Sequence, residues 1–395
     1  MESIEDKVAI VGMGCTKFGE LWDKSGDDLL IDATYEALED AGIGPEDVQA
    51  AWFGTAWSGL TALNVSVPLK TQYIPVTRVE NICATATEAL RAAIYAIAAG
   101  ACDVALAVGM EKLKDTFGVV GPQGSDIGIS SMGTSGIERI HIPTVYYSML
   151  AVRYFHRYGM SVEKGKELIA RIPVKSHHNA SMNPKAHFRN EITMDQVLKA
   201  PIIAYPLGLL DCCGYSDGAA AAVVTRADMA KSFRDDPISI KALSVNVGAR
   251  QGFLQQDYDY THVEANRRAA QAAYKEAGIS NPLKELSMAE VHDCFSIHEL
   301  VIYEDLQFCP PGGAKEYIEG GVFELDGELP VNTDGGLKCF GHPFGASGLR
   351  MIYEAYLQLQ GKAGPRQVKD PQLALCHNLG GGPGQGIGSV VIFGN

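Results

Sequence analysis

Apolar and polar residues follow one another along the chain in a pattern that predicts strands separated by amphipathic helices. A strand-like run, KVAIVGMG at 7–14, leads into a helical segment that ends with ALEDAGI at 37–43. The same order returns in IKALSVNVGAR at 240–250 and AYKEAGI at 273–279. Strands that alternate with helices are typical of mainly parallel sheets covered by helices. The pattern therefore predicts an α/β protein.

A gapless match indicates that the two halves of the chain are copies of one unit. Gly12 and Gly248 lie 236 positions apart, and so do Gly42 and Gly278. The second pair follows the predicted helices directly, where glycine suits a helix C-cap. Each copy is thus a strand, a loop, an amphipathic helix and a capping glycine.

A second match places a cysteine opposite a histidine. CATATEALRAAIYAIAAG at 83–100 and HPFGASGLRMIYEAYLQLQG at 342–361 share a Leu-Arg pair at an offset of 259 residues. Cys83 and His342 are then equivalent, and each opens a predicted helix. Chance similarity between alanine-rich helices is the alternative. Each half ends on a predicted strand, at 104–110 and 373–381.

The repeat pattern is interrupted once, which suggests an insertion in the first half. The Gly/Ser-rich run GPQGSDIGISSMGTSG precedes a helix-like stretch, and the first half resumes in DGAAAAVV at 217–224. We predict a first half formed by 1–115 plus 205–235, an inserted loop domain at 116–204, and a second half at 236–395.

Composition narrows the class of protein further. Of the 395 residues, 46% are hydrophobic and 20% charged, as in ordinary globular proteins. A net charge of −14 disfavours nonspecific nucleic-acid binding, and no apolar run is long enough for a membrane span. The acidic start MESIEDKVAIVG is no secretory signal, and the end VIFGN is no organelle address, so we expect a cytoplasmic protein. The nine cysteines form no CxxC motif, which indicates neither a zinc ribbon nor a disulfide framework.

The equivalent residues Cys83 and His342 are the first candidates for chemistry. A thiol before a helix meets the positive end of the helix dipole and unpaired N–H groups, which stabilise a thiolate. In FGHPFGASG, Pro343 is well placed to start the following helix. If the halves pack about a pseudo-twofold axis, the two helix N-termini converge. The resulting Cys/His pair suits nucleophilic acyl transfer.

Two further motifs, one with a cysteine and one rich in glycine, are expected to face the cleft where Cys83 and His342 meet. In VHDCF at 291–295, His292 and Cys294 lie two apart and share one face of an extended strand. His292 can donate to a developing oxyanion and Cys294 can move a proton. A metal site is the alternative, but two ligands without a third make it weak, and we expect no metal. GGGPGQG at 380–386 lacks the Lys-Ser/Thr of a P-loop, yet its N–H groups can approach a substrate oxygen closely.

Together, NICAT, VHDCF, NTDGGLKCFGHPFGASG and HNLGGGPG resemble the thiolase superfamily, specifically the sterol-carrier-protein-2-type thiolases, over essentially the whole chain. The resemblance implies a five-layer αβαβα fold of two duplicated mixed-sheet halves with an inserted loop domain. It also implies a homodimer or tetramer that makes or breaks the carbon–carbon bond of β-ketoacyl thioesters of coenzyme A. Coenzyme A is then a substrate or product, and no bound cofactor is implied.

The resemblance assigns a role to each motif residue. Cys83 is the nucleophile that carries the acyl group, and His342 activates it and helps bind the thioester oxygen. His292 shares that oxyanion role, and Cys294 is the acid/base at the α-carbon. The N–H groups of Cys83 and Gly380 form a second oxyanion hole.

Some positions depart from the common family pattern. Many thiolases carry the acid/base cysteine in a C-terminal CxG motif, where this chain has Asn378. Cys376 lies two residues earlier, so it remains an alternative to Cys294. We expect Asn378 and Ser347 to contact substrate. Thr85 replaces a smaller serine beside the acyl pocket.

The substrate and partners are less constrained by the sequence. Basic residues in the stretch 171–189 are a candidate patch for the coenzyme A phosphates, and a solvated face is the alternative. Aromatic side chains that suit an aromatic acyl group, or simple packing, are Trp57, Phe253, Tyr258 and Tyr260. Some resembling thiolases act beside a small partner with a zinc ribbon and an OB-like domain. Alternative functions are a retro-aldolase on β-hydroxyacyl-CoA, a CoA-independent C-acyltransferase in a multi-subunit complex, and a noncatalytic scaffold. No nucleic-acid or membrane partner is expected.

Overall fold

A nine-stranded mixed sheet forms the framework of the protein. The computed structural model describes residues 3–118, 142–249 and 258–395. The sheet has the strand order β3-β2-β4-β7-β1-β8-β11-β10-β9. Its strands are β1 Val8–Cys15, β2 Ala50–Gly54, β3 Val76–Val79, β4 Val104–Lys112, β7 Asp217–Arg226, β8 Ile238–Val247, β9 Met288–Glu290, β10 Leu373–Gly382 and β11 Gln385–Gly394. A separate small sheet pairs β5 Ile202–Ala204 with β6 Leu207–Gly208.

The strand pairings repeat across the middle of the sheet. In the first half β1 is antiparallel to β7, β7 is antiparallel to β4, and β4 is parallel to β2. In the second half β8, β11, β10 and β9 repeat this series with the same directions. The fifth strand, β3, has its counterpart in a single parallel bridge between Ala289 and Val331. The halves meet where β1 and β8 pair through Ala9 and Ile10. The predicted duplication of two mixed halves is confirmed.

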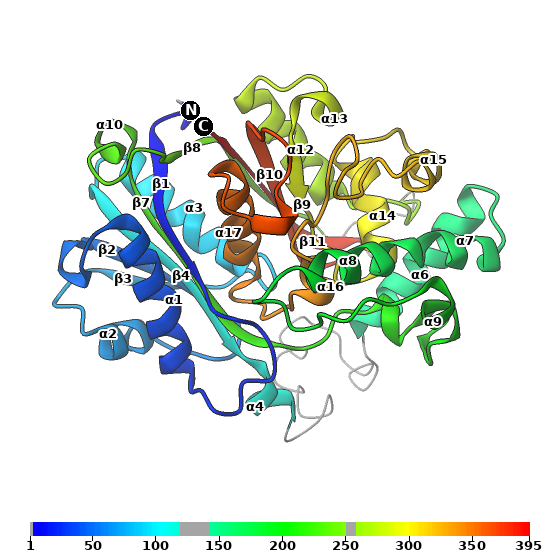
Figure 1. Cartoon of the computed structure of the whole chain (residues 1–395), viewed down its shortest axis with the longest axis horizontal. Coiled ribbons are helices and arrows are strands. Elements are labelled where there is room, and N and C mark those ends of the chain that lie inside the picture. Colours follow the sequence, from blue (N-terminus) through cyan, green and yellow to red (C-terminus); the bar gives the residue numbers. More distant parts are fainter. Residues whose placement is uncertain (1–2, 119–141, 250–257) are drawn as a thin grey trace.

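Helices form the outer and central layers around the two half-sheets (Figure 1). On the outside, α1 Gly26–Ala41 packs on β1 and β7, and α12 Glu264–Ala277 packs on β8 and β11. Between the half-sheets, α3 Thr85–Ala98 and α17 Ser347–Leu359 contact each other. Gly42 and Gly278 cap the two outer helices with φ of 70° and 69°, as predicted from the repeat. The layered α/β fold expected from the resemblance is confirmed.

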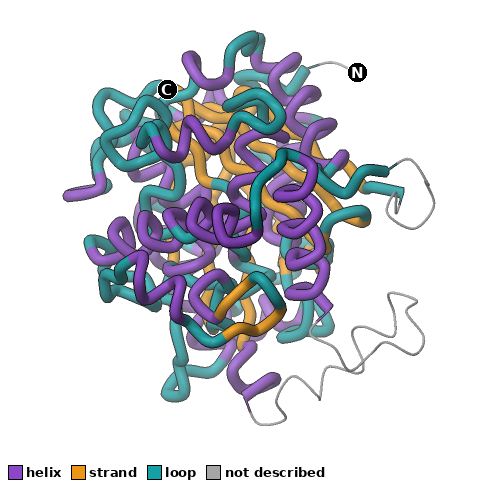
Figure 2. The backbone as a smooth tube through the Cα atoms, turned by 90° about the vertical axis from the view of Figure 1, so that its right-hand side faces the viewer, coloured by secondary structure: helices purple, strands orange, loops and turns teal. Residues whose placement is uncertain are grey.

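The inserted segment contributes helices beside the second half. They are α6 Ile142–Arg157, α7 Val162–Ile169, α8 Arg171–Ser181 and α9 Met194–Lys199. α6, α7 and α8 all contact α14 Ser296–Asp305, which follows the VHDCF motif. Figure 2 shows the strands enclosed by helices. The domain boundaries at 115/116 and 204/205 remain a prediction.

Short helices complete the chain: α2 Leu63–Leu69, α4 Leu113–Gly118, α10 Ala227–Ala230, α13 Pro282–Glu285, α15 Ala314–Glu319 and α16 Gly336–Cys339. Within the described ranges, none of the helices combines the length and the apolar character that crossing a membrane would require. Of the predicted pocket-lining residues, Phe253 lies outside the described ranges.

Two local expectations differ from the structure. Pro343 does not start a helix: α17 begins at Ser347, because the Pro343 carbonyl accepts from the N–H groups of Ala346 and Ser347 in a preceding turn. The strand β11 was not anticipated from the sequence, although it pairs with β10 over the whole of both strands. The glycine-rich run at 380–386 forms the hairpin between them, so its glycines partly serve this turn.

Candidate active site

Cys83 lies on a tight turn just before α3. The preceding residue, Ile82, has φ of 53°, a left-handed conformation that a β-branched residue rarely adopts. The Thr85 hydroxyl holds the turn, accepting from Asn81 N–H at 2.8 Å and donating to the Ile82 carbonyl at 2.5 Å. The Thr85 hydroxyl is thus committed to the turn. The effect of the bulkier Thr85 on the acyl pocket remains a prediction.

The end of β10 closes against this turn at a position that only glycine fits. A Cβ added to Gly380 would lie 2.2 Å from the carbonyl oxygen of Asn81. A side chain there would therefore push the Cys83 turn away from the sheet. Gly380 lies against the turn that carries Cys83, and its role in an oxyanion hole remains a prediction.

Hydrogen bonds fix which nitrogen of His342 carries the proton. Its Nδ1 lies 2.7 Å from Ser347 Oγ, and that hydroxyl lies 2.9 Å from the Pro343 carbonyl. A carbonyl only accepts, so the hydroxyl donates to Pro343 and accepts from His342 Nδ1–H. Nε2 of the neutral ring is then an acceptor. Ser347, expected to contact substrate, instead positions His342 in this structure.

The proton of His292 is fixed in the opposite sense. Its Nδ1 lies 3.2 Å from the Leu379 backbone nitrogen and 3.2 Å from Asn378 Nδ2. A backbone N–H only donates, so Nδ1 is the acceptor and Nε2 of the neutral ring carries the proton. Asn378, also expected to contact substrate, holds His292 here, and its Oδ1 has no hydrogen-bond partner among the described residues.

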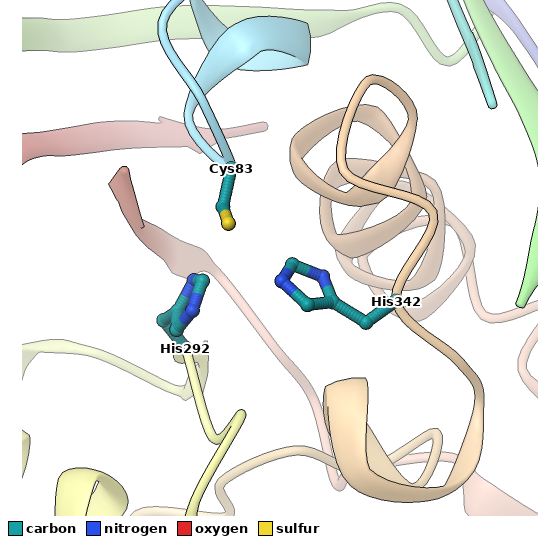
Figure 3. Close-up of side chains that lie close together, drawn as sticks. All are labelled: Cys83, His292 and His342. Atoms are coloured by element: carbon teal, nitrogen blue, oxygen red, sulfur yellow. The ribbon is translucent and has the colours of Figure 1, made fainter. Parts of the chain in front are cut away.

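The three side chains converge on one point (Figure 3). The Cys83 sulfur, one ring nitrogen of His292 and one ring nitrogen of His342 lie within 4.8 Å of one another. The two rings are perpendicular, with centroids 5.1 Å apart. The structure therefore brings the equivalent residues of the two halves together, as the repeat predicted.

The protonation states of these groups follow from their surroundings. Burial raises the pKa of the Cys83 thiol to about 12, against opposing hydrogen bonds from the backbone of Gly381 and of Cys83 itself. The backbone N–H group of Cys83, just before α3, lowers the pKa of the thiol, as expected at a helix N-terminus, but burial has the larger effect. Burial lowers the pKa of His342 to about 3 and holds the pKa of His292 well below its usual value. The resting site is a neutral thiol between two neutral imidazoles.

The two candidate acid/base cysteines lie in different surroundings. Cys294 belongs to a buried group in which its sulfur, one ring nitrogen of His292 and one ring nitrogen of His298 lie within 4.8 Å of one another. Cys376 on β10 lies opposite Glu290 on the neighbouring strand β9. The charges that act on its thiol are those of Glu290, Arg350 and Asp334. This placement favours Cys294 over Cys376.

These nitrogens and sulfurs also form two groups that resemble metal-ligand sets. Both groups, Cys83–His292–His342 and His292–Cys294–His298, share His292. Its Nδ1 is used by two N–H donors and its Nε2 carries the proton, so the neutral ring has no free lone pair for a metal. Each group is then left with two ligands, fewer than a catalytic zinc site uses.

Sequence reasoning missed the role of Asp293 within the VHDCF motif. Its carboxylate accepts from the backbone N–H groups of Leu337 at 2.6 Å and Lys338 at 3.3 Å. It thereby anchors α16, which leads directly to His342. The only available signal was its position between two candidate site residues.

The basic stretch at 171–189 is largely committed to internal contacts. Lys175 is buried in an ion pair with Glu299, and Lys185 pairs with Glu36 at 2.6 Å. The His177 ring bonds the Asn190 carbonyl. The stretch as a whole is therefore not the predicted phosphate-binding patch. The exposed members are Arg171, His178 and Arg189.

Aromatic rings gather beside His342. The Phe344 ring lies 4.8 Å from the His342 ring and 5.2 Å from Trp57. The Tyr215 ring lies 6.2 Å from the Phe344 ring. Trp57 was predicted near the acyl pocket, whereas Phe344 and Tyr215 were not.

Known proteins resemble this chain over most of its length. The family model described as thiolase, N-terminal domain, matches residues 8–228, and the model described as thiolase C-terminal domain-like matches residues 248–394. An acetyl-CoA acetyltransferase of Methanothermobacter thermautotrophicus is 38% identical over 380 residues, covering 95% of this chain and 96% of that protein. Benzoylsuccinyl-CoA thiolase subunit BbsB of Thauera aromatica is 33% identical over 386 residues, 96% of each chain. A solved structure described as Ltp2-ChsH2(DUF35) aldolase superposes with a TM-score of 0.85 at 27% identity, over 100% of this chain and 99% of that one.

Proposed function

This chain belongs to the thiolase family, and from that premise we propose that it makes or breaks the carbon–carbon bond of a β-ketoacyl-CoA through an acyl-enzyme on Cys83. The resemblance and the acyltransferase class expected from the sequence are confirmed. The observation that carries the assignment of residues is the convergence of Cys83, His292 and His342, whose hydrogen-bond partners assign opposite tautomers to the two rings. His342 offers a proton acceptor to Cys83, and His292 offers a proton donor to the same space.

In the cleavage direction, Cys83 gives its proton to His342 Nε2 as its sulfur attacks the β-carbonyl carbon. The raised pKa of the thiol and the lowered pKa of His342 disfavour this transfer in the resting site. The proton therefore moves together with the attack, when negative charge passes to the substrate oxygen. The carbon–carbon bond then breaks, leaving an acyl group on Cys83 and the enolate of the shortened thioester.

The enolate needs hydrogen-bond donors at its thioester oxygen. His292 Nε2–H is one donor, and His342 Nε2–H becomes a second once it has taken the Cys83 proton. Cys294 gives its proton to the α-carbon, which completes the first product. The incoming CoA thiol then loses its proton to the Cys294 thiolate and attacks the acyl-enzyme, and the released Cys83 thiolate recovers its proton from His342. Coenzyme A is thus a substrate, and the catalytic groups come from the chain itself.

The test is an acyl mass adduct on the Cys83 peptide after incubation with a series of aryl and linear β-ketoacyl-CoAs. We expect an adduct that CoA removes, and a Cys83→Ser variant that loses both the adduct and turnover. Cys102→Ser is the matched control, because Cys102 is also a partly buried thiol but lies in the loop that follows α3. A Cys83→Ser variant that turns over normally would overturn the proposal.

A retro-aldolase that cleaves β-hydroxyacyl-CoA is the second candidate. The observation that favours it is the likeness to a structure described as an aldolase over the full length of this chain. An aldol cleavage needs no acyl-enzyme, so the turn that presents Cys83 to two imidazoles argues for thiolysis. Release of an aldehyde or ketone without a Cys83 adduct would decide for the aldolase.

For partners, we propose a homodimer or tetramer and a small protein with a zinc ribbon and an OB-like domain. Two comparisons support the small partner: the aldolase structure is named for two proteins, and BbsB is named as a subunit. Co-purification of the chain with its genomic neighbours, followed by mass measurement of the intact complex, tests the oligomeric state and the small partner. A chain that binds no small protein at micromolar concentration contradicts the proposed partner.

The aromatic rings of Trp57, Phe344 and Tyr215 support an aromatic acyl group.

A further inference from the structure

His298 is a buried imidazole that the proposed reaction does not yet use. It lies in the first turn of α14 and is 0% exposed. Its Nδ1 lies 3.8 Å from the sulfur of Cys294, which is itself buried two residues before the helix. Its Nε2 has no hydrogen-bond partner among the described residues.

The surroundings of the ring place its proton on the side of Cys294. Nδ1 is the ring nitrogen that contacts the Cys294 sulfur, and the backbone of His292 raises the pKa of the ring. Because Nε2 is unpartnered, Nδ1 is the nitrogen placed to carry the ring's proton in a hydrogen bond. Nδ1–H is therefore a donor that faces Cys294.

A purely structural role explains this arrangement poorly. Burying a polar nitrogen without a partner costs stability that an aliphatic side chain of similar size would not lose. The ring packs against Tyr147, 4.8 Å between centroids, and against His292 at 5.3 Å. A leucine or phenylalanine would make these contacts as well. The feature that only a donor supplies is the contact with the Cys294 sulfur.

We propose that His298 is a positioning residue that donates Nδ1–H to the thiolate form of Cys294 during the α-proton step. The inference rests on the proposed function. In cleavage, Cys294 gives its proton to the enolate carbon and is left as a buried thiolate. His298 stabilises this anion without changing its own proton count, until the thiolate takes the proton of the CoA thiol. In condensation, the same thiolate removes the α-proton and becomes a thiol.

The need for such a donor follows from the charges around the sulfur. Burial holds the pKa of Cys294 well above its usual value, and Cys213, Cys83 and Asp293 raise it further. The Tyr147 hydroxyl opposes the rise. The groups that face His298 are His292, His377 and Tyr147. A second donor at Cys294, beside the Tyr147 hydroxyl, lowers the pKa of a thiol that burial, Cys213, Cys83 and Asp293 all raise.

The test separates the α-proton step from acyl transfer. Uptake of deuterium into the methyl group of acetyl-CoA in D2O reports the first, and the acetyl adduct on Cys83 reports the second. We expect His298→Leu to slow deuterium uptake about 10- to 100-fold, as for the loss of a hydrogen bond to a charged group, while the adduct forms at a near-normal rate. The pH at which uptake reaches half its maximum should rise in this variant. His298→Asn, which keeps an N–H donor near the sulfur, should recover most of the rate.

His377→Leu is the matched control, because His377 is also buried and neither of its ring nitrogens has a partner among the described residues. Its ring lies 6.5 Å from that of His298, and its nitrogens belong to neither group of converging ligand atoms. It should leave deuterium uptake unchanged. Equal loss of uptake and adduct in His298→Leu, or unchanged uptake, would overturn the inference, as would normal uptake in Cys294→Ala. Absence of the Cys83 adduct in the unmodified protein would instead refute the proposed function.

Discussion

Removing the hydroxyl that holds His342 should slow acyl transfer without disturbing the fold. In Ser347→Ala the Nδ1–H of His342 loses its acceptor inside a buried site. A buried donor left without a partner costs about 1–3 kcal/mol. The ring escapes this cost by moving its proton to Nε2, and it then no longer accepts a proton from Cys83.

The size of the effect on the acylation rate follows from the same free-energy penalty. A penalty of about 1–3 kcal/mol shifts the tautomer ratio by about 5- to 150-fold, since 1.36 kcal/mol corresponds to a factor of ten. We expect the single-turnover rate of Cys83 acylation to fall by that factor. Substrate affinity should change little, because Ser347 contacts His342 and Pro343 rather than the open side of the site.

The assay is rapid-quench mass spectrometry of the acyl adduct, with thermal unfolding measured in parallel. Ser176→Ala is the matched control: Ser176 is 0% exposed like Ser347, but its hydroxyl has no partner among the described residues. The control should acylate at the normal rate. Acylation of Ser347→Ala within twofold of normal would refute the assignment of tautomers.

Three further predictions test the surroundings of the site. In a steady-state assay, Gly380→Ala should reduce activity at least about 100-fold, because its Cβ would lie 2.2 Å from the Asn81 carbonyl oxygen and displace the Cys83 turn. Gly382→Ala is the control and should be nearly normal, because its Cβ would lie 3.7 Å from its nearest neighbour. Acylation measured in single turnovers should stay level from about pH 8 to about pH 5, because the pKa of His342 is lowered from 6.5 to about 3 and the base stays neutral over this range; an acid limb centred near 6.5 would contradict this. Arg350→Met should lower the free energy of unfolding, measured in urea, by about 3–5 kcal/mol, because it leaves the buried carboxylates of Glu290 and Asp334 without their partner. A loss below about 1 kcal/mol would show that these groups are not held as an ion pair.

Much of the fold was predictable because the two halves repeat the same local signals. Gly42 and Gly278 mark the same helix ends, and Cys83 and His342 precede equivalent helices, so the repeat alone brings the two side chains to the centre of the molecule. Strand β11 was missed because its predecessor ends in glycines, which sequence patterns read as a loop.

The chemistry of the site was less predictable, since it depends on burial and on backbone groups from distant segments. The Leu379 N–H that sets the tautomer of His292 carries no side-chain signal. The raised pKa of Cys83 depends on desolvation, which a motif does not reveal. Lys175 looked like part of an anion-binding patch, but its partner Glu299 is 124 residues away.

The proposed reaction depends on opposite tautomers of the two imidazoles that face Cys83. Nitrogen NMR of the histidine-labelled protein near neutral pH measures these tautomers directly. His292→Gln and His342→Gln variants assign the signals. We expect the proton on Nε2 of His292 and on Nδ1 of His342, with both rings neutral. Finding both rings with the same protonated nitrogen, or either ring fully protonated, would contradict the proposed pairing of donor and acceptor around the sulfur.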